Sequence, residues 1–268
     1  MPALTIGVFD SGFGGLTVLR ELLPLIPDAH YIYLGDTARL PYGSKSQTTI
    51  ARYAVESARF LELHGADHLV VACNTATALA LPEIVDSVHI PVTGVIEPVV
   101  RMTRERNAYA DTLILATHAT VQSHAYRVLC EANNLRPTEK ACPLLVPLIE
   151  EGWVDHPVTR DVLRIYLREA LDECCPQVVI LGCTHYPLIA PLVSEALTQL
   201  GSKATVIDSA QATAHAVSRR YTDPSQPPTN VNATFACYAT DSVEKFAQLG
   251  SQFLGQSIER VDLLDLGG

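Results

Sequence analysis

The sequence contains few positively charged residues and no cluster of them. It has 19 Lys and Arg residues against 29 Asp and Glu residues, which gives a formal net charge of −10 at pH 7. Because binding to a nucleic-acid backbone requires clustered cations, we expect no nucleic acid as the main partner. A small anionic substrate remains possible, since backbone N–H groups and helix N-termini bind carboxylates without a basic patch.

Long apolar runs are also missing. No apolar stretch approaches the roughly 20 residues that span a bilayer. The N-terminal stretch MPALTIGVFDSG lacks the charged and apolar regions of a signal peptide. We therefore expect no membrane partner and a cytoplasmic location. The seven cysteines are scattered and odd in number, which is typical of free thiols in a reducing compartment.

Several cofactor and metal motifs are absent. No CxxC pair or Cys/His quartet has the spacing of a zinc site, so we expect no metal. Glycines stand at 12, 14 and 15, but Thr17 occupies the place of the third glycine of GxGxxG, and a Walker A motif is missing. No lysine lies in a motif that suggests a pyridoxal Schiff base, so we expect no cofactor. We interpret the glycine-rich turn as one that brings backbone close to a small ligand.

Short apolar runs alternate with longer amphipathic segments, which is typical of parallel sheets covered by helices. The short runs are apolar throughout, as expected for strands buried on both faces. We expect helices over 46–64, 159–174 and 241–254. Gly65 is expected to end the first of them as a C-cap glycine, and residues 222–230 are expected to form a linker. The expected strands are Thr5–Phe9, Tyr31–Leu34, Leu69–Ala72, Thr112–Ala116, Val178–Leu181 and Thr205–Ile207.

The two halves of the chain repeat one arrangement. Near the start of each half a strand ends in a polar site, FDSG at 9–12 and ATHAT at 116–120. Later in each half a strand ends in a cysteine, Cys73 in VVACNTAT and Cys183 in VVILGCTH. Ligands bind at the carboxyl ends of strands in open α/β sheets. We therefore predict an α/β fold of two pseudo-symmetric domains, each a mostly parallel sheet flanked by helices, with the active site in the cleft between them. The predicted domains are residues 1–96 plus 208–268 and residues 97–207.

These two cysteines are the strongest candidates for catalysis. Each lies at a strand end before a segment that can open a helix, where backbone N–H groups and the helix dipole lower a thiol pKa from about 8.5. A lone cysteine after an apolar run is usually a small core residue, but here hydrogen-bonding side chains follow each thiol. These are Asn74 and Thr75 in the first half and Thr184 and His185 in the second. The cysteines expected only to pack are Cys130, Cys142, Cys174, Cys175 and Cys237.

Two opposed thiols suit a reaction in which a proton leaves one face of a carbon atom and another arrives at the opposite face. One thiolate removes the α-proton, the second thiol donates one, and the roles exchange in the reverse direction. An amino-acid α-proton is less acidic than a thiol by on the order of ten pKa units, which costs on the order of 14 kcal/mol. Fixed donors must therefore stabilise the carbanion. Donors of this kind are Asn74, Thr75, Thr117 and Thr184.

Several sequence blocks resemble those of the glutamate racemases. They are GVFDSGFGGLTVL, YLGDTARLPYGSKS, VVACNTATA, VPLIEEG and ILGCTHYPL, and the similarity covers nearly the whole chain, including TDSVEKF at 240–246. The resemblance implies a cofactor-independent amino-acid racemase with Cys73 and Cys183 as the acid/base pair. It implies Asp10 and His185 as assisting groups. The substrate contacts that it implies are Asp10, Ser11, Tyr42, Gly43, Asn74, Thr75, Thr117, Thr184 and His185.

The resemblance also implies a biological setting. Its members are bacterial cytoplasmic enzymes, usually dimers, that make D-glutamate from L-glutamate for cell-wall peptidoglycan. One departure concerns the Gly-Thr-x-Gly-Thr pattern of the family, where Ala116 and Ala119 replace the glycines and Thr117 is retained. Both Glu150 and Glu151 fit the family's acidic position, and the sequence leaves the choice open.

Three alternatives remain open from the sequence. A related two-cysteine racemase or isomerase would act on aspartate, a hydantoin or maleate. A Cys-His hydrolase or amidotransferase would use Cys183 with His185 and leave Cys73 dispensable, although the two-residue spacing favours His185 beside the ligand rather than as the direct base. A non-catalytic amino-acid-binding module would use both thiols only for packing.

Overall fold

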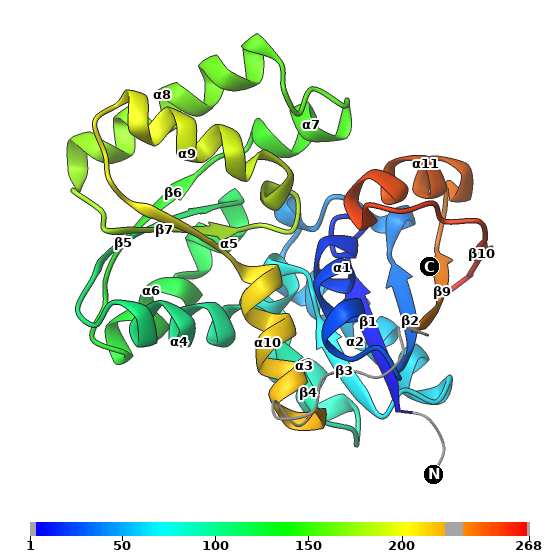
Figure 1. Ribbon diagram of the computed structural model, residues 1–268. Coiled ribbons are helices and arrows are strands. Elements are labelled where there is room, and N and C mark those ends of the chain that lie inside the picture. The colour runs from blue at the N-terminus through cyan, green and yellow to red at the C-terminus, as the bar shows by residue number, and fades with distance from the viewer. Residues whose placement is uncertain (1–3, 223–232, 267–268) are drawn as a thin grey trace.

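The computed structural model describes residues 4–222 and 233–266, which form two sheets covered by helices (Figure 1). The strands are β1 (Thr5–Asp10), β2 (His30–Gly35), β3 (His68–Val71), β4 (Val92–Gly94), β5 (Asp111–Ala116), β6 (Arg136–Ala141), β7 (Val178–Gly182), β8 (Thr205–Asp208), β9 (Thr234–Ala239) and β10 (Val261–Leu263). The first sheet has the order β10-β9-β2-β1-β3-β4, and the second has the order β6-β5-β7-β8. Every strand pair in these residues is parallel.

The two sheets share one strand order. The order β2-β1-β3-β4 in the first sheet has its counterpart in β6-β5-β7-β8, so β1 corresponds to β5 and β3 to β7. All residues of β3 and β7 are buried, which agrees with their apolar sequences apart from His68 at the start of β3. The predicted fold of two pseudo-symmetric α/β halves is confirmed, and the two halves place Cys73 and Cys183 directly after corresponding strands.

Helices cover both sheets, and two of them cross between the halves. They are α1 (Leu16–Leu25), α2 (Gln47–Leu63), α3 (Asn74–Ser87), α4 (Ile96–Arg106), α5 (His118–Ser123), α6 (Ala125–Ala132), α7 (Leu145–Glu150), α8 (Pro157–Glu173), α9 (Ala190–Gln199), α10 (Ser209–Tyr221) and α11 (Val243–Leu254), with the 3-10 helices η1 (Thr37–Arg39), η2 (Tyr42–Ser44) and η3 (Tyr186–Ile189). Helix α4 follows the first sheet but packs on α6 of the second half, whereas α10 follows the second sheet and packs on α1 (Figure 1). The domain division at 96/97 and 207/208 stays a prediction.

The predicted strands agree with β1, β2, β3, β5, β7 and β8 to within one residue at each end. The sequence analysis missed β4, β6, β9 and β10. Two of these have only three residues, and β6 is an edge strand whose residues are partly exposed and include three charged ones, so no apolar run marks it.

The predicted helices are present with small shifts at their ends. Ser46 is the N-cap of α2 and accepts a hydrogen bond from the backbone N–H of Thr49, while Gly65 has φ +90° just beyond the helix end. Helix α8 begins two residues earlier than expected, because Pro157 suits its first turn. The predicted linker at 222–230 lies outside the described residues except for Thr222. Within the described ranges, no helix is both long enough and apolar enough to cross a membrane.

Candidate active site

A cavity of about 450 Å³ lies at the carboxyl ends of the strands of both sheets. The segments that line it follow β1, β2 and β3 in the first half and β5, β6 and β7 in the second. Both candidate thiols, Cys73 and Cys183, line this cavity, and so do the other predicted site residues apart from Asp10. The predicted position of the site, in the cleft between the halves, is therefore confirmed.

Cys73 lies at the junction of β3 and α3. As the N-cap of α3, its sulfur accepts a hydrogen bond from the backbone N–H of Ala76 at 3.4 Å, and its thiol donates to Oγ of Ser11 at 3.5 Å. Burial, followed by the charge of the nearby Asp10, raises the pKa of Cys73 to about 12, and the hydrogen bonds with Ser11 and Ala76 oppose this rise. The expectation of a lowered pKa is wrong here, because desolvation outweighs the helix N-terminus.

His185 connects the second thiol to a carboxylate. Its Nδ1 lies 4.0 Å from the sulfur of Cys183, and its Nε2 lies 3.1 Å from Oε1 of Glu150. Burial lowers the pKa of His185, but the hydrogen bonds with Cys183 and Glu150 outweigh burial and raise the pKa to about 10. The imidazole is therefore protonated at neutral pH. His185 lines the cavity as expected, and it also contacts the thiol, which the two-residue spacing did not lead us to expect.

Asp10 lies at the end of β1, behind the cavity wall. Its side chain is 1% exposed, Oδ2 accepts the backbone N–H of Gly12 at 3.0 Å, and Oδ1 has no hydrogen-bond partner among the described residues. Burial raises the pKa of Asp10, while the positive charge of His185 and the backbone donors lower it. Asp10 therefore acts on the electrostatics of both thiol sites from a position outside the cavity lining.

Three threonine hydroxyls join the halves beside the cavity. Oγ1 of Thr75 in α3 lies 3.1 Å from that of Thr117, the N-cap of α5, and 3.2 Å from that of Thr120. The hydroxyls of Thr117 and Thr120 are 2.9 Å apart. Thr117 and Thr75 line the cavity, so their hydroxyl protons can turn towards an anion there.

Asn74 is held by groups from the second half. Its Oδ1 accepts a hydrogen bond from the hydroxyl of Tyr126 at 2.7 Å, and its Nδ2 donates to Oγ of Ser209 at 3.4 Å. This leaves one amide proton of Asn74 for a ligand.

The comparisons with known proteins agree with this geometry. The sequence profile of the Asp/Glu/Hydantoin racemase family matches residues 14–217. The chain belongs to this family. Its relatives include the glutamate racemase of Koribacter versatilis, which is 46% identical, with 98% of each chain covered.

Two solved structures extend the similarity to the fold. The glutamate racemase from Thermus thermophilus in complex with beta-chloro-D-alanine has a TM-score of 0.86 at 39% identity, covering 99% of this chain and 98% of that one. The glutamate racemase from Francisella tularensis in complex with D-glutamate has a TM-score of 0.88 at 32% identity, covering 99% of each chain. The identification with the glutamate racemases is confirmed, and the chain is an amino-acid racemase.

In this racemase the hydroxyl of Tyr42 forms a hydrogen bond within the loop that follows β2. Its hydroxyl donates to Oδ2 of the fully buried Asp36 at 2.6 Å, and Oδ1 of Asp36 accepts from the hydroxyl of Thr240 at 2.9 Å. Tyr42 and Gly43 both line the cavity, and the hydrogen bond to the buried Asp36 holds their loop in place.

The glycine-rich turn packs tightly on its surroundings. A Cβ atom on Gly14 would lie 2.4 Å from Oγ1 of Thr184 and 2.5 Å from Nδ1 of His185. A Cβ atom on Gly15 would lie 2.5 Å from the Cβ atom of Asp10. Neither glycine lines the cavity, although Ser11 in the same turn does. Gly14 therefore brings the backbone close to the second half of the protein, and the approach of this turn to a small ligand stays a prediction.

Some features of the site were missed in the sequence. Glu150, and not Glu151, contacts His185, although both line the cavity. Cys142 was expected only to pack, yet it lines the cavity, and Cys175 is exposed. In VPLIEEG two adjacent glutamates follow an apolar run, and this pattern does not indicate which carboxylate points inwards. In the described part of the chain, no group of three or more His, Cys, Asp or Glu residues is arranged to hold a metal ion.

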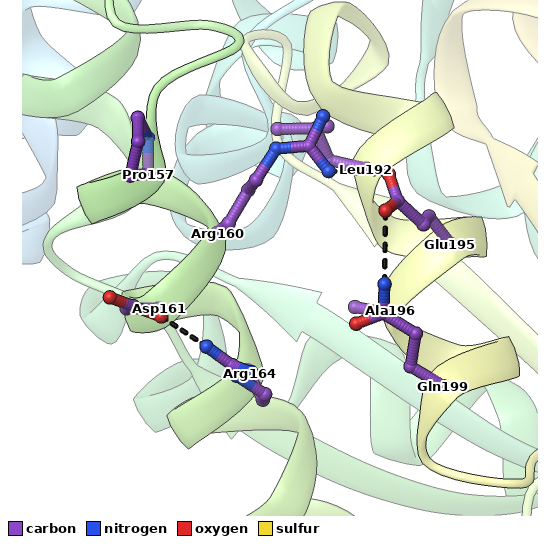
Figure 2. A pocket seen from close by; sticks show the side chains of 8 residues that line it. All are labelled: Pro157, Arg160, Asp161, Arg164, Leu192, Glu195, Ala196 and Gln199. Carbon is purple, nitrogen blue, oxygen red and sulfur yellow. Dashed lines mark hydrogen bonds and ion pairs between the residues drawn. The ribbon is translucent and has the colours of Figure 1, made fainter.

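A second cavity, of about 220 Å³, lies between α8 and α9 (Figure 2). Arg160 on its wall pairs with Asp155 and Glu195, and Arg164 pairs with Asp161. No thiol is among its lining residues in the described ranges. Because its arginines are already paired with carboxylates, this cavity offers no comparable chemistry.

Proposed function

We propose that this chain interconverts L-glutamate and D-glutamate, with Cys73 and Cys183 as the two acid/base groups and without an organic cofactor. The observation that carries the proposal is the placement of both thiols in one cavity, after corresponding strands of two halves that share a strand order. Thiols that come from opposite halves can face opposite sides of one substrate carbon.

The proton transfers follow from the surroundings of the two sulfurs. One sulfur, as thiolate, takes the proton from Cα, and the electron pair of the C–H bond remains on the substrate as a carbanion. The other thiol then donates its proton to the opposite face of Cα, which inverts the centre. Burial and the nearby Asp10 raise the pKa of Cys73, which favours its thiol form and makes it a proton donor. His185 lies 4.0 Å from the sulfur of Cys183, within reach to exchange a proton with it.

The cavity binds the substrate carboxylates without Lys or Arg, neither of which is among its lining residues. Hydroxyl groups of Ser11, Thr75, Thr117 and Thr184 line it instead. The backbone N–H groups at the start of α3 add donors of the kind that bind anions. Fixed donors of this kind also stabilise the carbanion that forms next to the α-carboxylate. Asp10 and His185 assist by acting on Cys73 and Cys183.

The similarity to glutamate racemases over nearly the full length of the chain supports glutamate rather than aspartate, a hydantoin or maleate as substrate. It favours neither a Cys-His hydrolase nor a binding module. We place the enzyme in the bacterial cytoplasm as a homodimer that supplies D-glutamate for peptidoglycan. The relatives from Koribacter versatilis and Geobacter metallireducens are bacterial, which supports this setting.

The test measures racemisation of the substrate and exchange of its α-proton with the solvent in one experiment. The purified protein, treated with EDTA and given no cofactor, is incubated in D2O with L-glutamate, D-glutamate or L-aspartate. Circular dichroism follows racemisation, and NMR follows the α-proton. We expect both glutamate enantiomers to become racemic and α-deuterated, with aspartate reacting at least a hundredfold more slowly. A requirement for added pyridoxal phosphate or metal, or a preference for aspartate, would contradict the proposal.

A further inference from the structure

Thr17 makes a hydrogen bond across the two halves of the protein. It lies in α1 of the first half and is fully buried. Its hydroxyl lies 3.0 Å from the backbone carbonyl of Thr184 and 2.9 Å from that of Gly14, so one proton is shared between two acceptors. Thr184 stands between the Cys183 thiol and His185. Thr17 therefore contacts the segment that carries the second thiol, which is 167 residues away in sequence.

The carbonyl of Thr184 needs a donor from outside its own turn. In a 3-10 turn, the donor for this carbonyl would be the backbone N–H three residues later, and that residue is Pro187, which has none. The next N–H group, of Leu188, bonds to the carbonyl of His185 instead. A buried carbonyl without a donor is unfavourable, so the Thr17 hydroxyl supplies what the local sequence cannot.

The turn that precedes α1 contacts the surroundings of both thiols. At its start, Oγ of Ser11 lies 3.5 Å from the sulfur of Cys73. Further on, Gly14 packs so closely on Thr184 and His185 that a Cβ atom would overlap with both side chains. The ring of Phe13 lies 5.9 Å from that of His185, centroid to centroid. One short segment thus links the Cys73 site with the Cys183 site.

We propose that Thr17 is a positioning residue, whose hydroxyl fixes the segment Cys183–His185 relative to Cys73. The inference rests on the proposed two-thiol racemisation. In that reaction both sulfurs must reach opposite faces of one carbon atom, and a misplacement of about 1 Å can cost about a hundredfold in rate. Thr17 does not line the cavity, so it acts through Thr184 and not on the substrate.

Loss of the Thr17 hydroxyl should change the α-deuterium isotope effects of L- and D-glutamate in opposite directions. The equilibrium constant of a racemisation is 1, so kcat/KM must stay equal in the two directions whatever residue is changed. A shift of Cys183 slows the deprotonation of the one enantiomer that Cys183 attacks. This step then becomes more rate-limiting, so the α-deuterium isotope effect rises for that enantiomer and falls for the other.

The experiment compares Thr17→Val, which removes the hydroxyl and keeps the shape, with Thr17→Ser, which keeps the hydroxyl. The matched control is Thr103→Val, because Thr103 is also fully buried in a helix and donates to the carbonyl of Val99 at 2.8 Å away from the cavity lining. We expect Thr17→Val to lower kcat/KM about tenfold and to make the isotope effects on α-deuterated L- and D-glutamate unequal. Thr17→Ser and Thr103→Val should stay within about twofold of the wild type, with unchanged isotope effects.

Separate variants tell the two proposals apart. Cys183→Ser identifies the enantiomer that depends on Cys183, and that enantiomer should show the larger isotope effect in Thr17→Val. Equal isotope effects in a folded Thr17→Val, or a Thr103→Val variant that behaves identically to it, would overturn the positioning role. If Cys73→Ser and Cys183→Ser both racemise glutamate like the wild type, the proposed function itself fails. Thermal unfolding of each variant measures any loss of stability independently of these readouts.

Discussion

The imidazole of His185 lies between two acidic groups, with Nε2 3.1 Å from the Glu150 carboxylate on one side and the Cys183 sulfur on the other. The two partners keep a buried imidazole protonated, with a pKa of about 10, although burial alone would lower the pKa. Among the described residues, His185 contacts the Cys183 sulfur, whereas the Cys73 sulfur contacts the hydroxyl of Ser11 and the backbone N–H of Ala76. The half-symmetric fold therefore holds its two cavity thiols in unlike surroundings.

Replacing Glu150 with Gln removes one of the two groups that raise the pKa of His185. His185 then loses its proton at a lower pH. We expect the alkaline limb of kcat/KM to move down by about one pH unit, so that activity falls about twofold at pH 9 and approaches a tenfold loss only above about pH 10. Profiles of kcat/KM against pH measure this. The control is Glu151→Gln, because Glu151 lines the same cavity without contacting His185. The alkaline limb of the pH profile of this control should coincide with that of the wild type. If the alkaline limbs of Glu150→Gln and Glu151→Gln coincide, the Glu150–His185 pair does not set the pKa of His185.

Protonation of the buried His68 should lower the free energy of unfolding in acid. It is buried between the hydroxyls of Tyr221 and Thr93, at 2.8 Å and 2.9 Å, and burial followed by the charge of Arg220 lowers its pKa to about 4. Because the folded pKa lies below the unfolded value of about 6.5, the unfolded state takes up the proton first, and stability falls as the pH drops from 6.5 towards 4. This costs about 2 kcal/mol between pH 7.5 and pH 5.

Urea unfolding of wild type and His68→Gln at several pH values checks the acid effect. The variant is expected to be less stable at pH 7.5 but to lose less stability on acidification. The exposed His89→Gln serves as the control and should follow the wild type. A parallel pH dependence in wild type and His68→Gln would rule out His68 as the source.

Tyr42→Phe should loosen the loop that lines the cavity. The change removes the 2.6 Å hydrogen bond to the buried carboxylate of Asp36. Loss of a donor to a buried charged group destabilises a protein by about 1–3 kcal/mol. Because Tyr42 and Gly43 line the cavity, a looser loop should raise KM more than it lowers kcat. Steady-state kinetics and thermal unfolding measure both effects. Tyr53→Phe, whose ring packs 6.2 Å from that of Tyr42, is the control, and an equal effect on KM there would contradict the role of Asp36.

Gly14→Ala should disrupt the contact between the halves. A Cβ atom at this position would lie within 2.5 Å of both Thr184 and His185, so one of the two side chains must move. We expect at least a hundredfold loss of kcat/KM, from the same sensitivity to misplacement that governs Thr17. Gly43→Ala adds a methyl group in ordinary contact, 3.7 Å from Thr117, and should fold with wild-type stability. Wild-type kinetics in a folded Gly14→Ala variant would show that the contact is unimportant.

Most of the site follows from local sequence, because its residues stand directly after apolar strands. In parallel sheets the carboxyl ends of the strands lie at one edge. The sequence alone therefore predicts that Cys73, Asn74 and Thr75 of the first half lie near Cys183 of the second. The repeat of a strand that ends in a polar site and a later strand that ends in a cysteine was visible for the same reason. The edge strand β6 was not visible, since its half-exposed polar residues carry no apolar run.

The missed features depend on contacts between residues that lie far apart in the sequence and on the depth of burial. The bond between Thr17 and Thr184 joins residues 167 positions apart, and the pairing of Glu150 with His185 joins residues 35 apart. The pKa of Cys73 was predicted in the wrong direction, because the sequence indicates the helix N-terminus but not the depth of burial. The close packing of Gly14 on Thr184 and His185 was not visible either, since these two residues lie in the other half.

The central claim is that two thiols exchange protons with opposite faces of one carbon atom. The most direct test measures racemisation and α-deuteration of L- and D-glutamate in D2O by Cys73→Ser and Cys183→Ser, with Cys142→Ser as the control thiol from the same cavity wall. We predict that each of the first two variants loses racemisation by at least about a thousandfold. Each should keep residual α-proton exchange with one enantiomer only, and the two variants should retain opposite enantiomers. Full racemisation by either variant, or exchange lost for the same enantiomer in both, would contradict the account.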